Sequence, residues 1–121
     1  MSEIVFIEHP RCTTCKKAKA WLDEHNVAYT DRNIKDDNPT KAELEKWIPA
    51  SGLPLRRFFN TSGTLYRSLG VKKMLDEGLS EDEATTLLAT DGMLVKRPLV
   101  LVDGVPLTPG FKPAEWEEKL L

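Results

Sequence analysis

The 121-residue sequence contains only two cysteines, no long hydrophobic run and almost no excess of either charge sign. Its longest apolar runs, Ile4–Ile7 and Leu99–Val102, are far shorter than the roughly 20 residues that a membrane-spanning helix needs. The 17 basic and 19 acidic side chains give a formal net charge of −2, which excludes a broad basic surface for direct nucleic-acid binding. The N-terminus also lacks the basic flank and apolar segment of a signal peptide. We therefore expect a cytoplasmic protein that contacts neither membranes nor nucleic acid directly.

The two cysteines, Cys12 and Cys15, lie three residues apart. A disulfide that closes so short a loop restricts the unfolded chain very little, and a reducing cytosol tends to open it. A structural zinc site needs about four ligands, and only His9 and His25 are available to join the thiols. The pair is therefore better explained by redox chemistry than by a structural crosslink, and we expect no bound metal or cofactor.

The pattern of apolar residues predicts a strand–helix–strand unit at the start of the chain. Ile4–Ile7 is a continuous apolar run with β-branched residues, typical of a strand that is buried on both faces of a parallel sheet. A helical pattern starts at Thr13 and ends near His25, and Val27–Ile34 then alternates loosely as a second strand. Such a unit requires a parallel strand pair with a right-handed crossover.

Helices are predicted to fill the middle of the chain, over about residues 40–90. Thr40 with Glu43 and Ser80 with Glu83 form capping-box patterns that open helices, and Pro49 is expected to end the first of these helices. Between residues 53 and 71, two glycines are expected to divide the chain into short helical pieces. These glycines are Gly63 and Gly70.

A β-hairpin and one more helix are predicted to close the fold. Leu99–Val102 predicts a buried strand, and Asp103-Gly104 predicts a tight turn into a short strand. Pro113 suits the first turn of a last helix. Because no repeat or long linker is visible, we expect one α/β domain over residues 1–121, with a mixed sheet and the helical insertion.

The CxxC motif falls where the first strand gives way to the first helix, which is typical of thioredoxin-like redox proteins. Unpaired amides of the first helical turn and the helix dipole point toward Cys12 and favour its thiolate, and Arg11 and Lys16 add positive charge. We expect Cys12 to be the nucleophile, with a lowered pKa, and Cys15 to resolve the mixed disulfide. Two buried, inert cysteines are the alternative, which suits Cys15 better than Cys12.

Several further segments resemble the ArsC/Spx family of thioredoxin-like proteins, in its CxxC-containing, Spx-like branch. The resemblance extends over essentially the whole chain. The matching segments are Cys12–Leu22, Asp31–Ile34, Gly63–Tyr66, Leu69–Gly70, Lys96–Leu99 and Gly110–Phe111.

The resemblance implies a thioredoxin-like fold in which a cis-proline, Pro98, faces the redox cysteine and Arg97 lies near Cys12. An ordinary proline at the start of a strand and a surface arginine are the alternatives. His9 either tunes the cysteines or is a solvated neighbour. The basic stretch Lys16–Lys19 is either a solvated helix face or a partner contact.

Three functions are compatible with this resemblance. The first is a thiol–disulfide oxidoreductase that acts, as a monomer, on a protein or small-molecule substrate and is recycled by glutathione, glutaredoxin or thioredoxin. The second is an Spx-like redox-switched regulator that binds the RNA polymerase α subunit, which is less expected because we do not expect the longer basic tail of Spx proteins here. The third is an arsenate reductase. We favour the oxidoreductase, because the regulator would use the same cysteines but would also need a partner-binding surface.

Arsenate chemistry needs cations around the cysteine, and arginine suits an oxyanion best because its fork binds two oxygens. The arsenate reductases of this family supply three arginines. Only the middle one matches here, at Arg97, while the first would fall at Asn60 and the third around Gly110. We therefore expect a poor arsenate reductase unless the fold brings other cations inward. The candidates for this are Arg56, Arg57 and Lys112.

Overall fold

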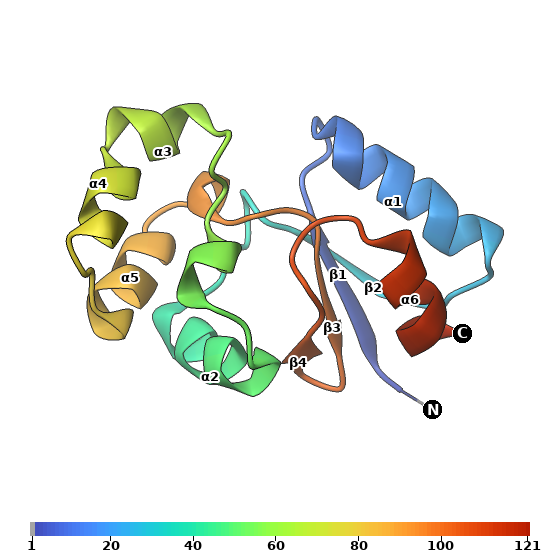
Figure 1. The fold of residues 1–121 in the computed structure, drawn as a ribbon. Coiled ribbons are helices and arrows are strands. Elements are labelled where there is room, and N and C mark those ends of the chain that lie inside the picture. Colours follow the sequence, from blue (N-terminus) through green and yellow to red (C-terminus); the bar gives the residue numbers. More distant parts are fainter. Residues whose placement is uncertain (1) are drawn as a thin grey trace.

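The computed structural model describes residues 2–121 and places a four-stranded mixed sheet between two groups of helices (Figure 1). The strands are β1 (Ile4–Glu8), β2 (Thr30–Asn33), β3 (Leu99–Val102) and β4 (Val105–Pro106). Their order in the sheet is β2-β1-β3-β4, and β1 pairs in parallel with β2 and antiparallel with β3. The strand that leads into the cysteine motif is therefore held from both sides.

Two helices, α1 (Thr13–Glu24) and α6 (Pro113–Leu120), cover one face of this sheet (Figure 1). Strand residues alternate between the faces, so that Phe6 packs under these helices while Ile7 packs on the opposite side. Trp116 of α6 is completely buried here. The buried residues of this cluster are Phe6, Ala18, Leu22, Val100, Leu107 and Trp116.

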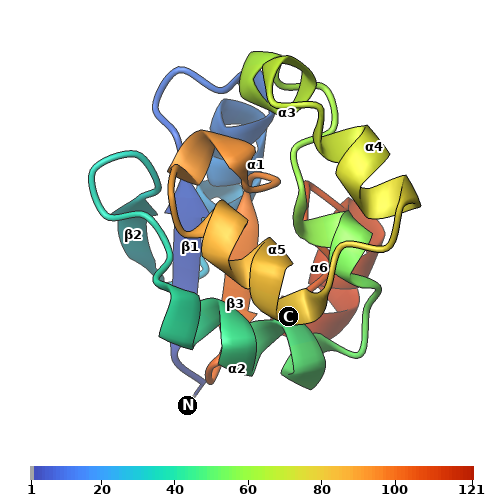
Figure 2. The ribbon, with the colours of Figure 1, turned by 90° about the vertical axis from the view of Figure 1, so that its left-hand side faces the viewer.

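The opposite face carries the helical insertion, which Figure 2 shows from its outer side. It packs around a larger apolar core that includes Ile7, Leu44, Phe58 and Leu99. Two 3₁₀ turns, η1 (Leu55–Phe58) and η2 (Gly92–Leu94), accompany its helices. The helices are α2 (Lys41–Ser51), α3 (Thr64–Ser68), α4 (Val71–Asp76) and α5 (Glu81–Leu88).

The mixed α/β fold and the parallel β1–β2 pair confirm the main predictions from sequence. Both capping boxes are formed, at Thr40 with Glu43 and at Ser80 with Glu83. The second strand is shorter than predicted, since only residues 30–33 pair with β1. No helix within residues 2–121 combines the length and apolar character needed to cross a membrane.

The prediction that Pro49 ends the second helix was wrong. The helix α2 continues through Pro49 to Ser51 and ends at Gly52, whose φ of 70° is left-handed. Pro49 lies in the last turn, where its missing N–H removes a single helical hydrogen bond. The N–H of Gly52 then donates to the Pro49 carbonyl, and this bond closes the helix.

Gly92 occupies a place in the fold where no side chain fits. A Cβ atom at this position would lie 2.1 Å from the carbonyl oxygen of Ile34, which belongs to the segment after β2. Since that oxygen is backbone, no side-chain rotation can relieve the overlap. Gly92 thus fixes the path of the chain from α5 to the residues that precede β3.

We predict that Gly92→Ala lowers the free energy of unfolding by about 3 kcal/mol, because the clash must be relieved by backbone movement. Gly52→Ala is the control: it has open space around the added Cβ and should cost only about 1 kcal/mol for its left-handed φ. Urea denaturation of both variants measures the difference. A Gly92→Ala protein as stable as Gly52→Ala would contradict this assignment.

Candidate functional site

The helix α1 begins on a cysteine sulfur. Cys12 is its N-cap residue, with φ −82° and ψ 118°, and its Sγ accepts a hydrogen bond from the N–H of Cys15 at 3.3 Å. A tight turn precedes it, in which the Cys12 N–H donates to the carbonyl of His9 at 3.0 Å. The sulfur therefore lies against the unpaired amides of the first helical turn, as the sequence predicts.

The two free thiols differ in exposure. Cys12 is partly exposed, whereas Cys15 is completely buried on the face of α1 that packs toward the sheet. A substrate sulfur can therefore meet Cys12 first.

The surroundings of the two thiols shift their pKa values in opposite directions. Burial raises the pKa of Cys12, but hydrogen bonding from the thiol and N–H of Cys15, together with the nearby Arg97 guanidinium, lowers it below its ordinary value. Burial raises the pKa of Cys15 to about 12, and Cys12 beside it adds to the increase. Cys12 therefore forms a thiolate more readily, whereas Cys15 keeps its proton.

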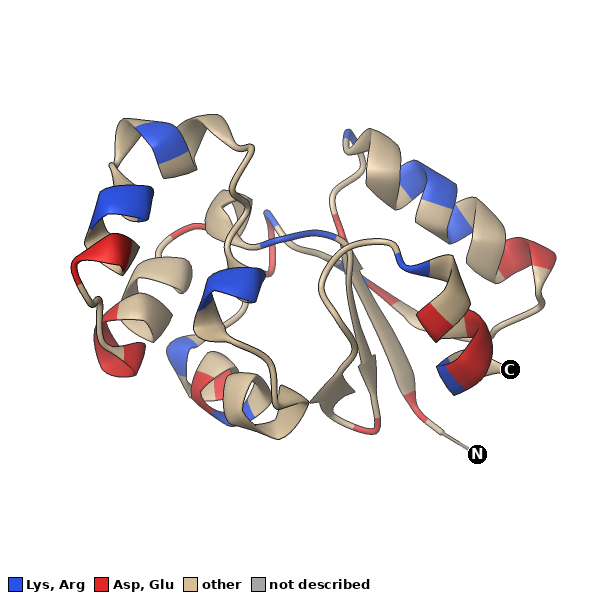
Figure 3. Cartoon of the chain, in the orientation of Figure 1, with Lys and Arg blue, Asp and Glu red and all other residues tan. Residues whose placement is uncertain are grey.

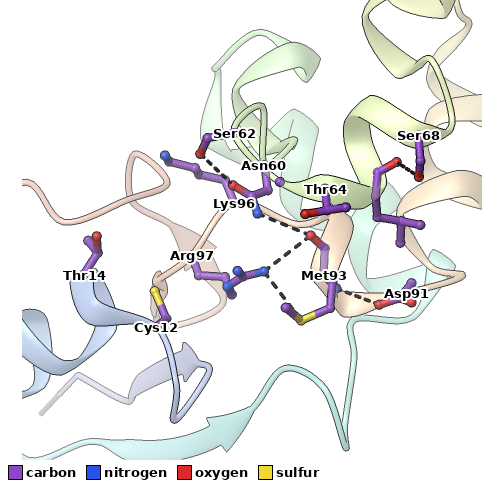
Figure 4. A pocket seen from close by; sticks show the side chains of 12 residues that line it. Cys12, Thr14, Asn60, Ser62, Thr64, Ser68, Asp91, Met93, Lys96 and Arg97 are labelled. Carbon is purple, nitrogen blue, oxygen red and sulfur yellow. Dashed lines mark hydrogen bonds between the residues drawn. The ribbon is translucent and has the colours of Figure 1, made fainter.

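The side chain of Arg97 lies between Cys12 and the helical insertion (Figure 4). Its Nη1 donates to the carbonyl of Met93 at 3.4 Å and contacts the Met93 sulfur at 3.8 Å. Its buried Nε has no hydrogen-bond partner within residues 2–121. The Arg97–Pro98 peptide bond is cis, as the family resemblance implies, and the Pro98 carbonyl accepts from the N–H of Gly110 at 2.9 Å. Arg97 is therefore held against Met93, and its buried Nε keeps an unused hydrogen-bond donor within the described residues.

Cys12 borders two hollows of the surface. The first has a volume of about 590 Å³ and lies between α1 and the start of α3 (Figure 4). Besides Cys12 and Arg97 it is lined mainly by polar side chains of the insertion and of the segment before β3, namely Asn60, Ser62, Thr64, Ser68, Asp91 and Lys96. The second, of about 550 Å³, is lined by His9, Pro10, Arg11, Asn33 and Lys35 together with Cys12, Met93 and Arg97. Cys12, which is partly exposed, therefore lines both hollows.

The other predicted supporting residues differ in whether they line a hollow beside Cys12. Arg11 is exposed and lines the second hollow, whereas Lys16 is exposed on α1 and lines neither hollow. Neither is among the groups with the largest effects on the Cys12 pKa. Burial and the neighbouring Arg97 lower the pKa of His9, whose Nδ1 accepts from the Arg11 N–H at 3.2 Å. His9 is therefore mainly neutral near pH 7.

The additional cations considered for an arsenate pocket do not reach Cys12. Arg56, Arg57 and Lys112 line a separate hollow instead. Asn60 lines the first hollow together with Cys12, at the position where the family resemblance implies an arginine in the reductases. Among residues 2–121, Arg97 is therefore the one arginine that lines the first hollow together with Cys12.

Sequence reasoning assigned no role to Met93 and Lys96, which line the first hollow, nor to Glu8, which lines neither hollow. Glu8 ends β1 and is buried, and burial next to the Asp31 carboxyl raises its pKa to about 7, opposed by Lys19. Lys96 belongs to the family-matching segment beside Arg97 but was given no role of its own, and Met93 gave no signal in the sequence. No cluster of three potential metal ligands exists among residues 2–121.

We predict that the alkylation rate of Cys12, measured against pH in Cys15→Ser, rises at a lower pH than that of a free cysteine. In Cys12→Ser, the rate of Cys15 should rise only at a higher pH, because burial disfavours its thiolate. Arg97→Gln should raise the pKa of Cys12 by removing a positive neighbour. A Cys12 that titrates at or above the free-thiol value would exclude it as the activated nucleophile.

Comparison with known proteins relates this site to a family. The ArsC family model matches residues 8–119. The protein YusI from Bacillus subtilis is 48% identical over 115 residues, which cover 95% of this chain and 96% of that protein. The global transcriptional regulator Spx from Staphylococcus aureus is 29% identical over 112 residues, covering 93% of this chain and 82% of that protein.

A solved structure shows the same likeness. The crystal structure of a possible arsenate reductase from Streptococcus mutans UA159 is 43% identical, with a TM-score of 0.89, and the match covers 98% of this chain and 99% of that chain. The relatives thus include both a regulator and a structure described as a reductase. Since the family model spans nearly the whole chain and the fold agrees, this protein belongs to the ArsC family of thioredoxin-like proteins.

Proposed function

We propose that the protein is a thiol–disulfide oxidoreductase in which Cys12 attacks and Cys15 resolves. The observation that carries this proposal is the opposed pair of thiols: a partly exposed Cys12 with a lowered pKa, and a buried Cys15 with a raised pKa. The N–H···Sγ bond of 3.3 Å brings the backbone of Cys15 onto the Cys12 sulfur. Two inert structural thiols would not need this asymmetry.

The reaction has two balanced steps. In the first, the Cys12 thiolate attacks one sulfur of a substrate disulfide, so that a bond from Cys12 to that sulfur forms, the substrate S–S bond breaks, and the departing thiolate takes a proton from solvent. In the second, Cys15 loses its proton and attacks the Cys12 sulfur, which forms the Cys12–Cys15 disulfide and releases the second substrate thiolate. Two electrons pass from the protein to the substrate.

An external thiol must then return the protein to its reduced form. Glutathione, glutaredoxin or thioredoxin are the reductants that the family resemblance implies. Attack on the Cys12–Cys15 disulfide is expected at the Cys12 sulfur, because the Cys15 sulfur is completely buried. Mixed-disulfide exchange of this kind needs no bound cofactor.

We predict that Cys15→Ser forms a stable mixed disulfide between Cys12 and its substrate, because the resolving thiol is absent. Cys12→Ser should reduce disulfides only at the background rate and should trap nothing. Mass spectrometry of the trapped species from cell extract identifies the substrate, and intact mass shows loss of two hydrogens when the wild-type protein is mildly oxidised. Equal trapping by both variants, or a mainly cross-linked dimer as the oxidised product, would refute the assigned roles.

A second candidate function is an Spx-like redox-switched regulator. The 29% identity to the Staphylococcus aureus regulator Spx favours it, and it would use the same cysteine pair as a switch. Pull-down with the RNA polymerase α subunit, compared between the reduced and the oxidised protein, separates the two functions. Stable binding that depends on the redox state would favour the regulator.

Arsenate reduction is less favoured by the charges near Cys12. Lys96 and Arg97 are the cations that line the first hollow within residues 2–121, and Asp91 adds a carboxylate to it. The second hollow adds Arg11 and Lys35, both of which are exposed. A transition state with more negative charge than arsenate itself needs fixed donors, and Arg97 alone has the anchoring contacts described above.

We predict that arsenate turnover with glutathione and glutaredoxin, or with thioredoxin, is at least about 100-fold below a typical enzyme rate, because each missing oxyanion contact costs roughly 10²–10³ in rate. Reduction of a disulfide by the same preparation is the positive control. Arsenate turnover at a typical enzyme rate that disappears in Arg97→Ala would show that this single arginine suffices, and would overturn the prediction.

A further inference from the structure

A third hollow, of about 360 Å³, is lined by four cations from three separate segments. Arg56 and Arg57 belong to η1, Lys96 precedes β3, and Lys112 precedes α6. No carboxylate lines this basic hollow in the part of the chain that the structure describes. Figure 3 shows positive positions on each of these three segments. In a chain of net charge −2, such a local excess of positive charge is not a consequence of composition.

Backbone hydrogen bonds hold these segments together. The N–H of Lys96 donates to the carbonyl of Phe58 at 2.8 Å, which joins the segment before β3 to η1. The N–H of Gly110 donates to the carbonyl of Pro98 at 2.9 Å, which joins the segment before α6 to β3. The positions from which the four cations extend are therefore fixed relative to one another, although the side chains of Arg56, Arg57 and Lys112 are exposed.

Lys96 connects the basic hollow with the first hollow beside Cys12. It lines both of them, and the short segment 60–62 divides them, with Asn60 and Ser62 on the side of Cys12 and Thr61 on the basic side. A ligand whose sulfur meets Cys12 can therefore continue past Lys96 into the basic hollow. The first hollow alone is large enough for a small-molecule disulfide, so only a longer chain would occupy both.

We propose that the basic hollow binds an acidic protein segment that lies next to the disulfide on which Cys12 acts. This inference rests on the proposed oxidoreductase function and adds its substrate class, a protein disulfide with flanking carboxylates. Carboxylate oxygens accept from the Arg57 guanidinium and from the ammonium groups of Lys96 and Lys112, and Arg56 is already paired with Asp76 at 2.9 Å. Exposed pairs of this kind are individually weak, so they select among substrates rather than bind them tightly.

The test uses two peptides of roughly ten residues, which span about 30 Å when extended. Each carries one cysteine in a disulfide with 2-mercaptoethanol, flanked by glutamates in one peptide and by glutamines in the other. The reduced protein is mixed with each peptide, and mass spectrometry follows release of the peptide thiol and formation of the Cys12–Cys15 disulfide. We expect the glutamate peptide to react about three- to tenfold faster at low salt, and the advantage to fall at high salt.

Two double variants assign the effect to the basic hollow. Arg57→Gln with Lys112→Gln should bring the glutamate peptide down to the rate of the glutamine peptide. Lys46→Gln with Lys73→Gln removes the same charge from exposed positions on α2 and α4, and should leave the difference in place. Circular dichroism verifies that both variants are folded, which is expected because all four side chains are exposed.

A small neutral disulfide, bis(2-hydroxyethyl) disulfide, separates the two levels of the proposal. If it is reduced while both peptides react equally, the acidic-segment inference is overturned and the oxidoreductase function stands. A charge effect that occurs with glutathione disulfide but not with the peptides would also overturn the inference, because a small carboxylate ligand would then explain the cations. Failure of all these disulfides to react would overturn both proposals.

Discussion

The hydrogen bond from the Cys15 N–H to the Cys12 sulfur is the interaction on which the site depends. Helix N-caps are usually serine, threonine, aspartate or asparagine, whose oxygen accepts from a first-turn amide. Here a thiol sulfur takes that place, so the start of the helix and the reactive atom are one feature. Strand β1 makes this possible, because parallel pairing with β2 and antiparallel pairing with β3 fix the point at which the chain turns toward Cys12.

The helical insertion gives the sulfur its second wall. Without the insertion, Cys12 would lie uncovered beyond the end of β1. Residues 60–68 of the insertion close one side of the hollow next to it. The insertion is tied to the segment before β3 through Phe58 and Lys96, and η2 is fitted against the Ile34 carbonyl at Gly92. Packing far from the cysteines thereby determines which side chains, Arg97 above all, stand opposite them.

The elements near the motif could be predicted from the sequence because their signals are local. The apolar run of β1, the capping boxes and the CxxC spacing depend on neighbours within a few residues, and each occurs where it was expected. The prediction for Pro49 failed because a proline in the last turn of a helix costs less free energy than a proline in the helix interior. The wider site could not be derived in this way. Met93 and Lys96 belong to a segment that long-range contacts hold, such as the bond from the Lys96 N–H to the Phe58 carbonyl. The division of cations between two hollows follows the path of one short segment, residues 60–62.

The sulfur cap has a consequence for the reduction potential of the cysteine pair. The amide and guanidinium that favour the Cys12 thiolate act on the reduced protein and lose that partner when the sulfur enters a disulfide. Stabilising the reduced state makes the disulfide a stronger oxidant, by about 30 mV for each unit that the thiolate pKa falls below the ambient pH. The buried Cys15 does not offset this, because it stays protonated at neutral pH in the folded and unfolded chain alike. The geometry of one helix terminus thus acts on the redox equilibrium of this pair, in the direction that holds its two electrons more tightly.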